Sequence, residues 1–348
     1  MKVSNFKSGI SVPPLSQFVA KYSEAIKEKW QQWVPWEVAV RKGLDNSLHF
    51  VIHASADEPP RHLSHLYPVS NPKDIEKVCK NIARKYKVIS TEEYVDRLRY
   101  GELGEKNVLA TVSCDDGLRE FKAYLWPIMK KYSIPCTLFL VKNFVERKEY
   151  FYRFKASLIS EALEDSEASK ETRNCLEKLG KNVDPQTSIK RTIGQIRHPK
   201  DLWIFDKLLE HLNIDAETYF EKTKPFLDRS EVIELHKDGV RLGSHGVHHY
   251  RYDLISSDDV EADILNGVTY IQNLSGQMTV EHAFPFNGRT ISRKLLHNLL
   301  LRQPSLTHFF DTGGIRRDEP FVTHRVILDS KRPQRALRIA AYEYLNTK

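Results

Sequence analysis

Cysteine, long apolar runs and blocks of basic residues are all scarce in this 348-residue chain, and each shortage narrows what the protein can be. The 4 cysteines form no C-x-x-C pair, and Cys114 and Cys136 lie in apolar runs typical of buried strands, so we expect small core residues in a reducing compartment. Lys and Arg (53) only slightly outnumber Asp and Glu (46) and form no dense block, so we predict no nucleic-acid partner. The net charge of +7 favours solubility and some attraction for anionic substrates.

The sequence also gives no indication of a membrane-spanning or secreted protein. No stretch approaches ~18 consecutive apolar residues, and the N-terminal sequence has no apolar segment of the kind that signal peptides contain. Hydrophobic residues make up 41% of the chain and charged residues 28%, which is ordinary for a globular protein. We therefore predict a folded protein without a transmembrane segment, located in the cytoplasm.

Apolar strands and amphipathic helices alternate along most of the chain. The strand-like runs include "SLHFVIH", which ends at His53, followed by "NVLATVSC", "PCTLFLV", "THFFDTGG" and "HRVILD". Such alternation is typical of α/β proteins with a parallel sheet or barrel. The length fits one large domain with a sizeable insertion.

One long segment interrupts this alternation, because residues 145–222 read as successive helices with polar connectors and no strand. We therefore divide the chain into an N-terminal helical extension (1–45), a first barrel part (46–144), a helical insertion (145–222) and a second barrel part (223–348). The aromatic and basic residues of the insertion could cover the mouth of the barrel and restrict the substrate. The alternative is that the insertion only packs on the barrel or forms a dimer contact.

Two adjacent carboxylates, Asp115 and Asp116, follow a predicted buried strand in "SCDDG". In parallel α/β folds the carboxyl ends of the strands are where catalytic groups gather. Neighbouring carboxylates repel each other, so the pair is costly unless a metal ion or a proton is shared. The alternative is structural, since Asp116 could cap the helix that begins near Leu118.

Three histidines lie within five positions in "RLGSHGVHHYRYDL": His245, His248 and His249. His245 and His249 can face one metal ion from either a helical or an extended segment, whereas His245 and His248 can do so only from a helix. Because Gly243 and Gly246 disfavour a long helix, we prefer the first pair. Two imidazoles with one carboxylate from the aspartate pair would make a catalytic metal site with open positions.

Together, the two motifs resemble those of the polysaccharide deacetylase family, the NodB-homology or carbohydrate esterase family 4 type. The family's T-F-D-D-G motif is "SCDDG" at 113–117, and its H-[ST]-x-x-H motif in a "GSH" context is "GSHGVHH" at 243–249. "AFPFNGR" resembles the family's Pro-aromatic-Gly loop. The resemblance covers roughly residues 48–330, apart from the insertion.

This resemblance implies a distorted (β/α)7 barrel that holds a divalent metal ion, usually zinc, at its C-terminal mouth. The metal ligands would be Asp116, His245 and His249, and Asp115 would be the catalytic base. His248 falls on a non-ligand position. The residues expected to contact the substrate are His53, Pro285, Phe286 and Arg325.

The sequence departs from the family pattern at several positions. Gly246 replaces the hydroxyl residue of the histidine motif, and the arginine expected before the Pro-aromatic-Gly loop is missing. The late Leu-x-His motif, which supplies the family's general acid, is Leu328-Asp329-Ser330 here. His324 is our best substitute for the general acid, with His53 and His282 as rivals. Arg325 could hold a carboxylate or could be a surface cation.

The function that this resemblance implies is removal of an acyl group, expected to be acetyl, from an N-acylated sugar. We expect the substrate to be a glycan or glycolipid precursor that carries phosphate or lipid, and a lipid-linked substrate would bring the protein to a membrane surface. The alternatives are a catalytically impaired barrel that only binds carbohydrate, and a cyclic-amide hydrolase of the same fold.

Overall fold

The computed structural model describes residues 47–103, 108–164, 166–181, 183–184, 186–312, 318–330 and 333. The predicted N-terminal extension (1–45) lies outside the described residues. Within them, no helix is long and apolar enough to cross a membrane.

Parallel strands form the centre of the molecule, in the order β8-β7-β6-β5-β4-β3-β1-β9, with β2 paired to β3. The two ends of this order, β8 and β9, are separated in sequence by Arg325 alone, so the sheet nearly closes into a barrel. This confirms the predicted α/β barrel. The strands are β1 (Ser47–Ile52), β2 (Lys87–Val88), β3 (Leu109–Cys114), β4 (Cys136–Leu140), β5 (Arg241–Ser244), β6 (Val280–Ala283), β7 (Leu306–Asp311), β8 (Val322–His324) and β9 (Val326–Ile327).

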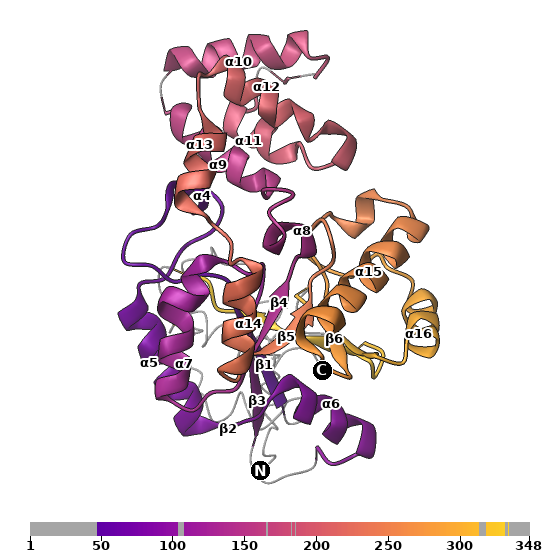
Figure 1. The fold of residues 1–348 in the computed structure, drawn as a ribbon. Helices are drawn as coiled ribbons and strands as arrows, with labels where there is room; N and C mark the ends of the chain where they lie inside the picture. The colour runs from indigo at the N-terminus through magenta and orange to yellow at the C-terminus, as the bar shows by residue number, and fades with distance from the viewer. Residues whose placement is uncertain are drawn as a thin grey trace, which may run out of the picture.

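Helices surround the barrel (Figure 1). Strands β1, β3 and β4 are buried along their whole length, which explains why they read as continuous apolar runs rather than alternating ones. All of the surrounding helices named below except α7 begin at a residue whose side chain caps the helix; Asp228 and Glu231, for example, form a capping box at the start of α14. These helices are α5 (Pro72–Lys85), α6 (Thr91–Tyr100), α7 (Trp126–Lys131), α14 (Arg229–Lys237), α15 (Ser257–Ser275) and α16 (Arg293–Arg302).

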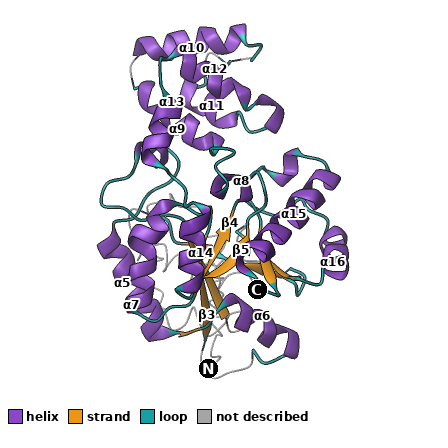
Figure 2. Cartoon of the chain, in the orientation of Figure 1, coloured by secondary structure: helices purple, strands orange, loops and turns teal. Residues whose placement is uncertain are grey.

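A second group of helices lies beyond one end of the barrel, at the top of Figure 1, and Figure 2 shows this group as purely helical. These helices are α9 (Tyr152–Ala162), α10 (Ser166–Lys178), α11 (Ile189–Gln195), α12 (Trp203–His211) and α13 (Ala216–Thr223). Their apolar faces bury a common cluster that includes Phe154, Leu208 and Phe220, and this cluster extends to Val141 and Phe144 just after β4. The helical group therefore packs onto the carboxyl ends of the strands.

Short elements connect these layers. They are α4 (Arg61–Ser64), α8 (Lys142–Val145), the π-helical turn η1 (Phe121–Leu125), and the 3-10 turns η2 (Pro199–Asp201) and η3 (Tyr252–Leu254).

Candidate active site

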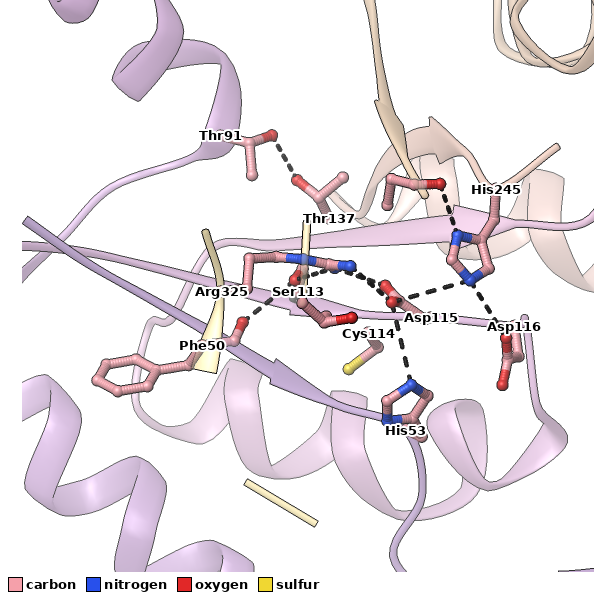
Figure 3. A network of polar contacts seen from close by, with 12 residues as sticks. Phe50, His53, Thr91, Ser113, Cys114, Asp115, Asp116, Thr137, His245 and Arg325 are labelled. Atoms are coloured by element: carbon pink, nitrogen blue, oxygen red, sulfur yellow. Dashed lines mark hydrogen bonds and ion pairs between the residues drawn. The ribbon is translucent and has the colours of Figure 1, made fainter. Parts of the chain in front are cut away.

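The turn after β3 separates the directions of the two adjacent carboxylates, Asp115 and Asp116 (Figure 3). Asp116 and Gly117 both have positive φ, +72° and +74°, so the chain reverses sharply where the buried strand ends. A side chain at position 117 would lie 2.7 Å from a methyl group of Leu140, which explains the glycine there. Asp116 turns toward the histidines that follow β5, and Asp115 turns toward the seam between β8 and β9.

Asp116, His245 and His249 converge on one point. Nε2 of His249 lies 3.1 Å from Oδ1 of Asp116, and Nε2 of His245 lies 3.5 Å from the same oxygen. Nδ1 of His245 lies 2.8 Å from the carbonyl oxygen of Ala283, which can only accept, so Nδ1 carries the proton and Nε2 presents its lone pair. All three side chains are buried. The carboxylate of Asp116 therefore faces the two histidines rather than the helix that follows it.

The hydrogen bonding of this group fits a bound cation. Oδ1 of Asp116 and Nδ1 of His249 are buried and have no hydrogen-bond partner. Burial would raise the pKa of Asp116, but the two histidines hold that pKa well below its usual value, so the residue is a carboxylate. Burial also lowers the pKa of His249, which favours the neutral imidazole that metal ions bind. One oxygen and two nitrogens, all within 4.8 Å of one another, match the ligand set of a catalytic zinc ion.

Asp115 is held from behind by Arg325, which lies in the one-residue gap between β8 and β9 (Figure 3). Two nitrogens of the guanidinium donate to the two oxygens of Asp115 over 2.7 and 2.8 Å. Burial alone would raise the pKa of Asp115, but the Arg325 charge lowers it, so the carboxylate is ionised. Arg325 is only 2% exposed. The structure thus gives it the carboxylate-holding position that the sequence left open, and its burial excludes the alternative of a surface cation.

His53, which follows the end of β1, lies next to Asp115. Its Nε2 lies 4.0 Å from Oδ2 of Asp115, and its Nδ1 forms a short hydrogen bond with the carboxylate of Asp329. The backbone N–H of His53 also donates to Asp329, over 2.9 Å. Burial would lower the pKa of His53, but the Asp329 carboxylate outweighs it and raises that pKa to about 10. Asp329 is the middle residue of Leu328-Asp329-Ser330, the segment that stands where the family has Leu-x-His, and the histidine position itself is Ser330. This departure was the only sequence signal for the His53–Asp329 pair.

The other two histidines proposed as general acids have different surroundings. Nε2 of His324 lies 3.0 Å from a carboxylate oxygen of Asp318, which also accepts two hydrogen bonds from Arg293. His282 is fully buried, with Ser244 Oγ at 3.1 Å from its Nδ1. None of these contacts involves Asp115, whereas His53 lies 4.0 Å from it, so His53 is the candidate that the structure places beside the aspartate pair.

Gly246, the departure at the centre of the histidine motif, has a physical reason. A Cβ at this position would lie 2.1 Å from a carboxylate oxygen of Asp263, and the φ of Gly246 is +81°. Asp263 projects from α15 and accepts hydrogen bonds from the backbone N–H of Val247 (3.1 Å) and from Tyr252 Oη (2.7 Å). A carboxylate from a neighbouring helix therefore holds this loop from outside. His248 contacts Glu149 at 2.8 Å rather than the other histidines.

Two aromatic side chains, Phe286 and Phe151, contact His249. Phe286, in the Pro-aromatic-Gly loop, has a φ of +61°, and its ring centroid lies 4.9 Å from that of His249. Thr312 Oγ1 donates to the carbonyl oxygen of Phe286 and so fixes this loop, while the neighbouring Pro285 is buried. Phe151, at the start of the helical group, lies 4.6 Å from His249 on another side. The helical group thus reaches the edge of the candidate site.

The comparison with protein families gives a match that runs from the last helices of the helical group into the second part of the barrel. Residues 199–299 match the family model described as polysaccharide deacetylase. This segment contains both converging histidines and the Phe286 loop. The resemblance to polysaccharide deacetylases is confirmed. A search of curated protein sequences gave no match.

Solved structures are similar to this polysaccharide deacetylase-like chain over most of its length. The Streptococcus pyogenes deacetylase PplD in complex with acetate is 14% identical, with 84% of this chain and 96% of that chain covered and a TM-score of 0.53. BC0361, a polysaccharide deacetylase from Bacillus cereus, is 13% identical (84% and 68% covered, TM-score 0.48). IcaB from Ammonifex degensii is 14% identical (86% and 99% covered, TM-score 0.47). The first of these supports the NodB-type barrel fold.

Proposed function

We propose that the protein is a metal-dependent deacetylase that hydrolyses the N-acyl group of a sugar. The proposal rests on one observation. His245 and His249 converge on Oδ1 of Asp116, an oxygen with no hydrogen-bond partner, and the ionised Asp115 lies beside this group. The Oδ2 atom of Asp115 lies 3.9 Å from Nε2 of His245, so the base lies directly beside the residues that would hold the metal. When bound there, a divalent cation, most readily zinc, polarises the acyl carbonyl and acidifies the attacking water.

Asp115 is the base that accepts the proton of that water. Arg325 and Ser113 fix its orientation, because Arg325 Nη1 bridges Ser113 Oγ at 2.9 Å and Asp115 Oδ1 at 2.7 Å. Both oxygens of Asp115 keep a lone pair after binding the guanidinium. The oxygen of the water forms a bond with the acyl carbon as its proton moves to Asp115.

His53 is the acid that completes the hydrolysis. As the C–N bond breaks, Nε2 of His53 donates its proton to the amine nitrogen of the sugar, which leaves with the bonding electron pair. The carboxylate of Asp329 keeps His53 protonated and sets its ring orientation through Nδ1. His53 is also 18% exposed, so a bound sugar can reach it. The products are the free carboxylic acid and the amino sugar.

The acyl group is proposed to be acetyl and the sugar to be part of a glycan or glycolipid precursor. Acetate is the small acid that was solved with the Streptococcus pyogenes deacetylase, which supports an acetyl group. The partly exposed ring of Phe286 beside His249 suits the apolar face of a sugar ring.

The test combines metal analysis with acetate release from N-acetylated sugars. We expect purified protein to contain a stoichiometric divalent metal ion and to release acetate. Asp115→Asn should keep the metal and lose activity by about 10²–10⁴-fold, and His53→Gln should do the same. Lys155→Met is the control that should change neither, because Lys155 of α9 pairs with Asp206 of α12 and not with a residue of the candidate site. A wild-type protein that binds no divalent metal would refute the proposal.

A further inference from the structure

A small cavity lies between the helical group and the mouth of the barrel. Its volume is about 190 Å³. Pockets that hold whole drug-sized ligands are larger, roughly 300–1,000 Å³, so this one suits a single compact group. Its walls come from α9, α11, the loop before η3 and the Phe286 loop, which are far apart in sequence.

The walls of this cavity are strongly basic. Four cationic side chains line it, and no aspartate or glutamate does; the four are Arg153, Lys190, Arg197 and Arg251. Arg251 is paired with Asp253 at 2.7 Å, and Lys190 lies 3.8 Å from Glu164. Among the described residues, no carboxylate lies within ion-pair distance of Arg153 or Arg197. Arg197 does interact with the nearby charge of Asp253, and its Nε donates to the carbonyl oxygen of Gly194 over 2.7 Å. Lys190 and Arg197 are exposed to solvent, and a cluster of cations that solvent can reach attracts anions.

The cavity adjoins the candidate active site through one aromatic ring. The guanidinium carbons of Arg153 and Arg251 lie 5.9 and 5.6 Å from the ring centre of Phe286. The ring of Phe286 also lies 4.9 Å from that of His249. A substrate that places its N-acyl group at the histidines can therefore extend past Phe286 into the basic cavity.

We propose that this cavity binds a phosphate or diphosphate ester group of the substrate. Planar guanidinium groups bind phosphate oxygens through paired hydrogen bonds, and the two unpaired arginines would match a dianion. Hydroxyl groups at the wall, such as Ser160, add donors. The assignment of the anion to the substrate rests on the deacetylase function proposed above, whereas the existence of the anion site does not.

The first experiment measures binding of inorganic pyrophosphate by calorimetry, with the full chain. Because pyrophosphate also binds metal ions, the titration is done with Asp116→Asn as well as with wild-type protein, and we expect both to bind. Arg153→Met and Arg197→Met should each weaken binding by at least about 10-fold, as expected for a charge-assisted hydrogen bond. Arg191→Met is the matched control, because Arg191 is an exposed cation next to Lys190 that does not line the cavity. Binding that vanishes in Asp116→Asn, or that the arginine variants leave unchanged, would overturn the anion site.

The second experiment asks whether the anion belongs to the substrate. Acetate release is compared for an N-acetylated sugar phosphate and for the same sugar without phosphate. Arg197→Met should lower kcat/KM for the phosphorylated sugar by at least about 10-fold more than for the plain one. An equal loss for both sugars would overturn the substrate assignment even if pyrophosphate binds. If wild-type protein deacetylates neither sugar but binds pyrophosphate, the deacetylase proposal fails and the anion site stands.

Discussion

Two groups of aspartate and histidine lie at the carboxyl ends of the strands, and they differ in where their positive charge comes from. Asp116, His245 and His249 form one, and Asp311, Asp318 and His324 form the other; in each, three ligand atoms lie within 4.8 Å of one another. In the second group the chain itself supplies the cation, since Arg293 donates to both oxygens of Asp318 at 2.7 and 2.6 Å.

The backbone also satisfies the second group. The N–H groups of Gly288 (3.0 Å) and Thr312 (2.7 Å) both donate to Asp311, so this group anchors the loop that carries Phe286. No guanidinium or backbone N–H donates to the converging oxygen of Asp116. Residue types alone therefore do not define a metal site; the deciding feature is whether the protein has already neutralised the carboxylate.

The difference between the two groups is tested most directly by the same substitution in each, Asp116→Asn and Asp318→Asn. Asp116→Asn should abolish stoichiometric metal binding and lower acetate release by about 10³-fold or more, because a bound metal contributes several kcal/mol to catalysis. Asp318→Asn should keep the metal, because its group needs none. Elemental analysis and activity assays on both variants check this. Metal loss in Asp318→Asn with retention in Asp116→Asn would reverse the two assignments.

The two groups should also differ in whether a bound metal ion raises the free energy of unfolding through them. A chelator-treated wild type should gain about 2.7 kcal/mol of unfolding free energy when zinc is added at 100 times its Kd. Asp318→Asn should show the same gain and Asp116→Asn none, since only the first group binds the ion. Urea unfolding with and without zinc measures the difference. A gain of equal size in Asp116→Asn would place the stabilising ion elsewhere.

The candidate ligands could be predicted from the sequence because each lies in a short motif next to a strand end. Asp116 follows an apolar strand directly, and the spacing of His245 and His249 already favoured one pairing. Arg325 and Asp329 could not be placed, since they reach Asp115 and His53 only when the barrel closes. The single strand expected in "HRVILD" is in fact two, split at Arg325, and this break turns the guanidinium inward.

The reason for the glycine at position 246 and the existence of the basic cavity could not be predicted from the sequence either, for a related reason. The group that occupies the space beside Gly246 is the carboxylate of Asp263, on a helix that packs on the loop from outside. The cavity joins residues of α9 and α11 to Arg251, and no local pattern links these segments. Contacts between distant segments depend on the packed fold, which periodicity and motif spacing do not describe.

A smaller effect is expected from restoring the hydroxyl residue of the family motif, Gly246→Ser. The new side chain would clash with Asp263 and strain a residue at φ +81°, so we expect a loss of about 2 kcal/mol in unfolding free energy. In the double variant with Asp263→Ala, part of this loss should be recovered, because the clash disappears while the strain remains. Chemical denaturation of the four proteins in this cycle gives the coupling. Strictly additive losses would mean that Asp263 does not fill the position of the missing side chain.

The histidine–carboxylate pairs His53–Asp329 and His324–Asp318 should also differ in how their contribution to stability depends on pH. Asp329 raises the pKa of His53 from 6.5 to about 10, so the protonated form is favoured in the folded state. The resulting stability is fully present below pH 6.5 and is lost progressively as the pH rises toward 10, at up to about 1.4 kcal/mol per pH unit. In chelator-treated protein, Asp329→Asn should therefore destabilise most near pH 6 and least near pH 10. Asp318→Asn serves as the comparison, because Arg293 stays charged throughout this range and the pair it holds should not follow the same curve. Unfolding free energies at several pH values decide the matter, and a constant effect of Asp329→Asn would mean that its carboxylate binds a neutral His53.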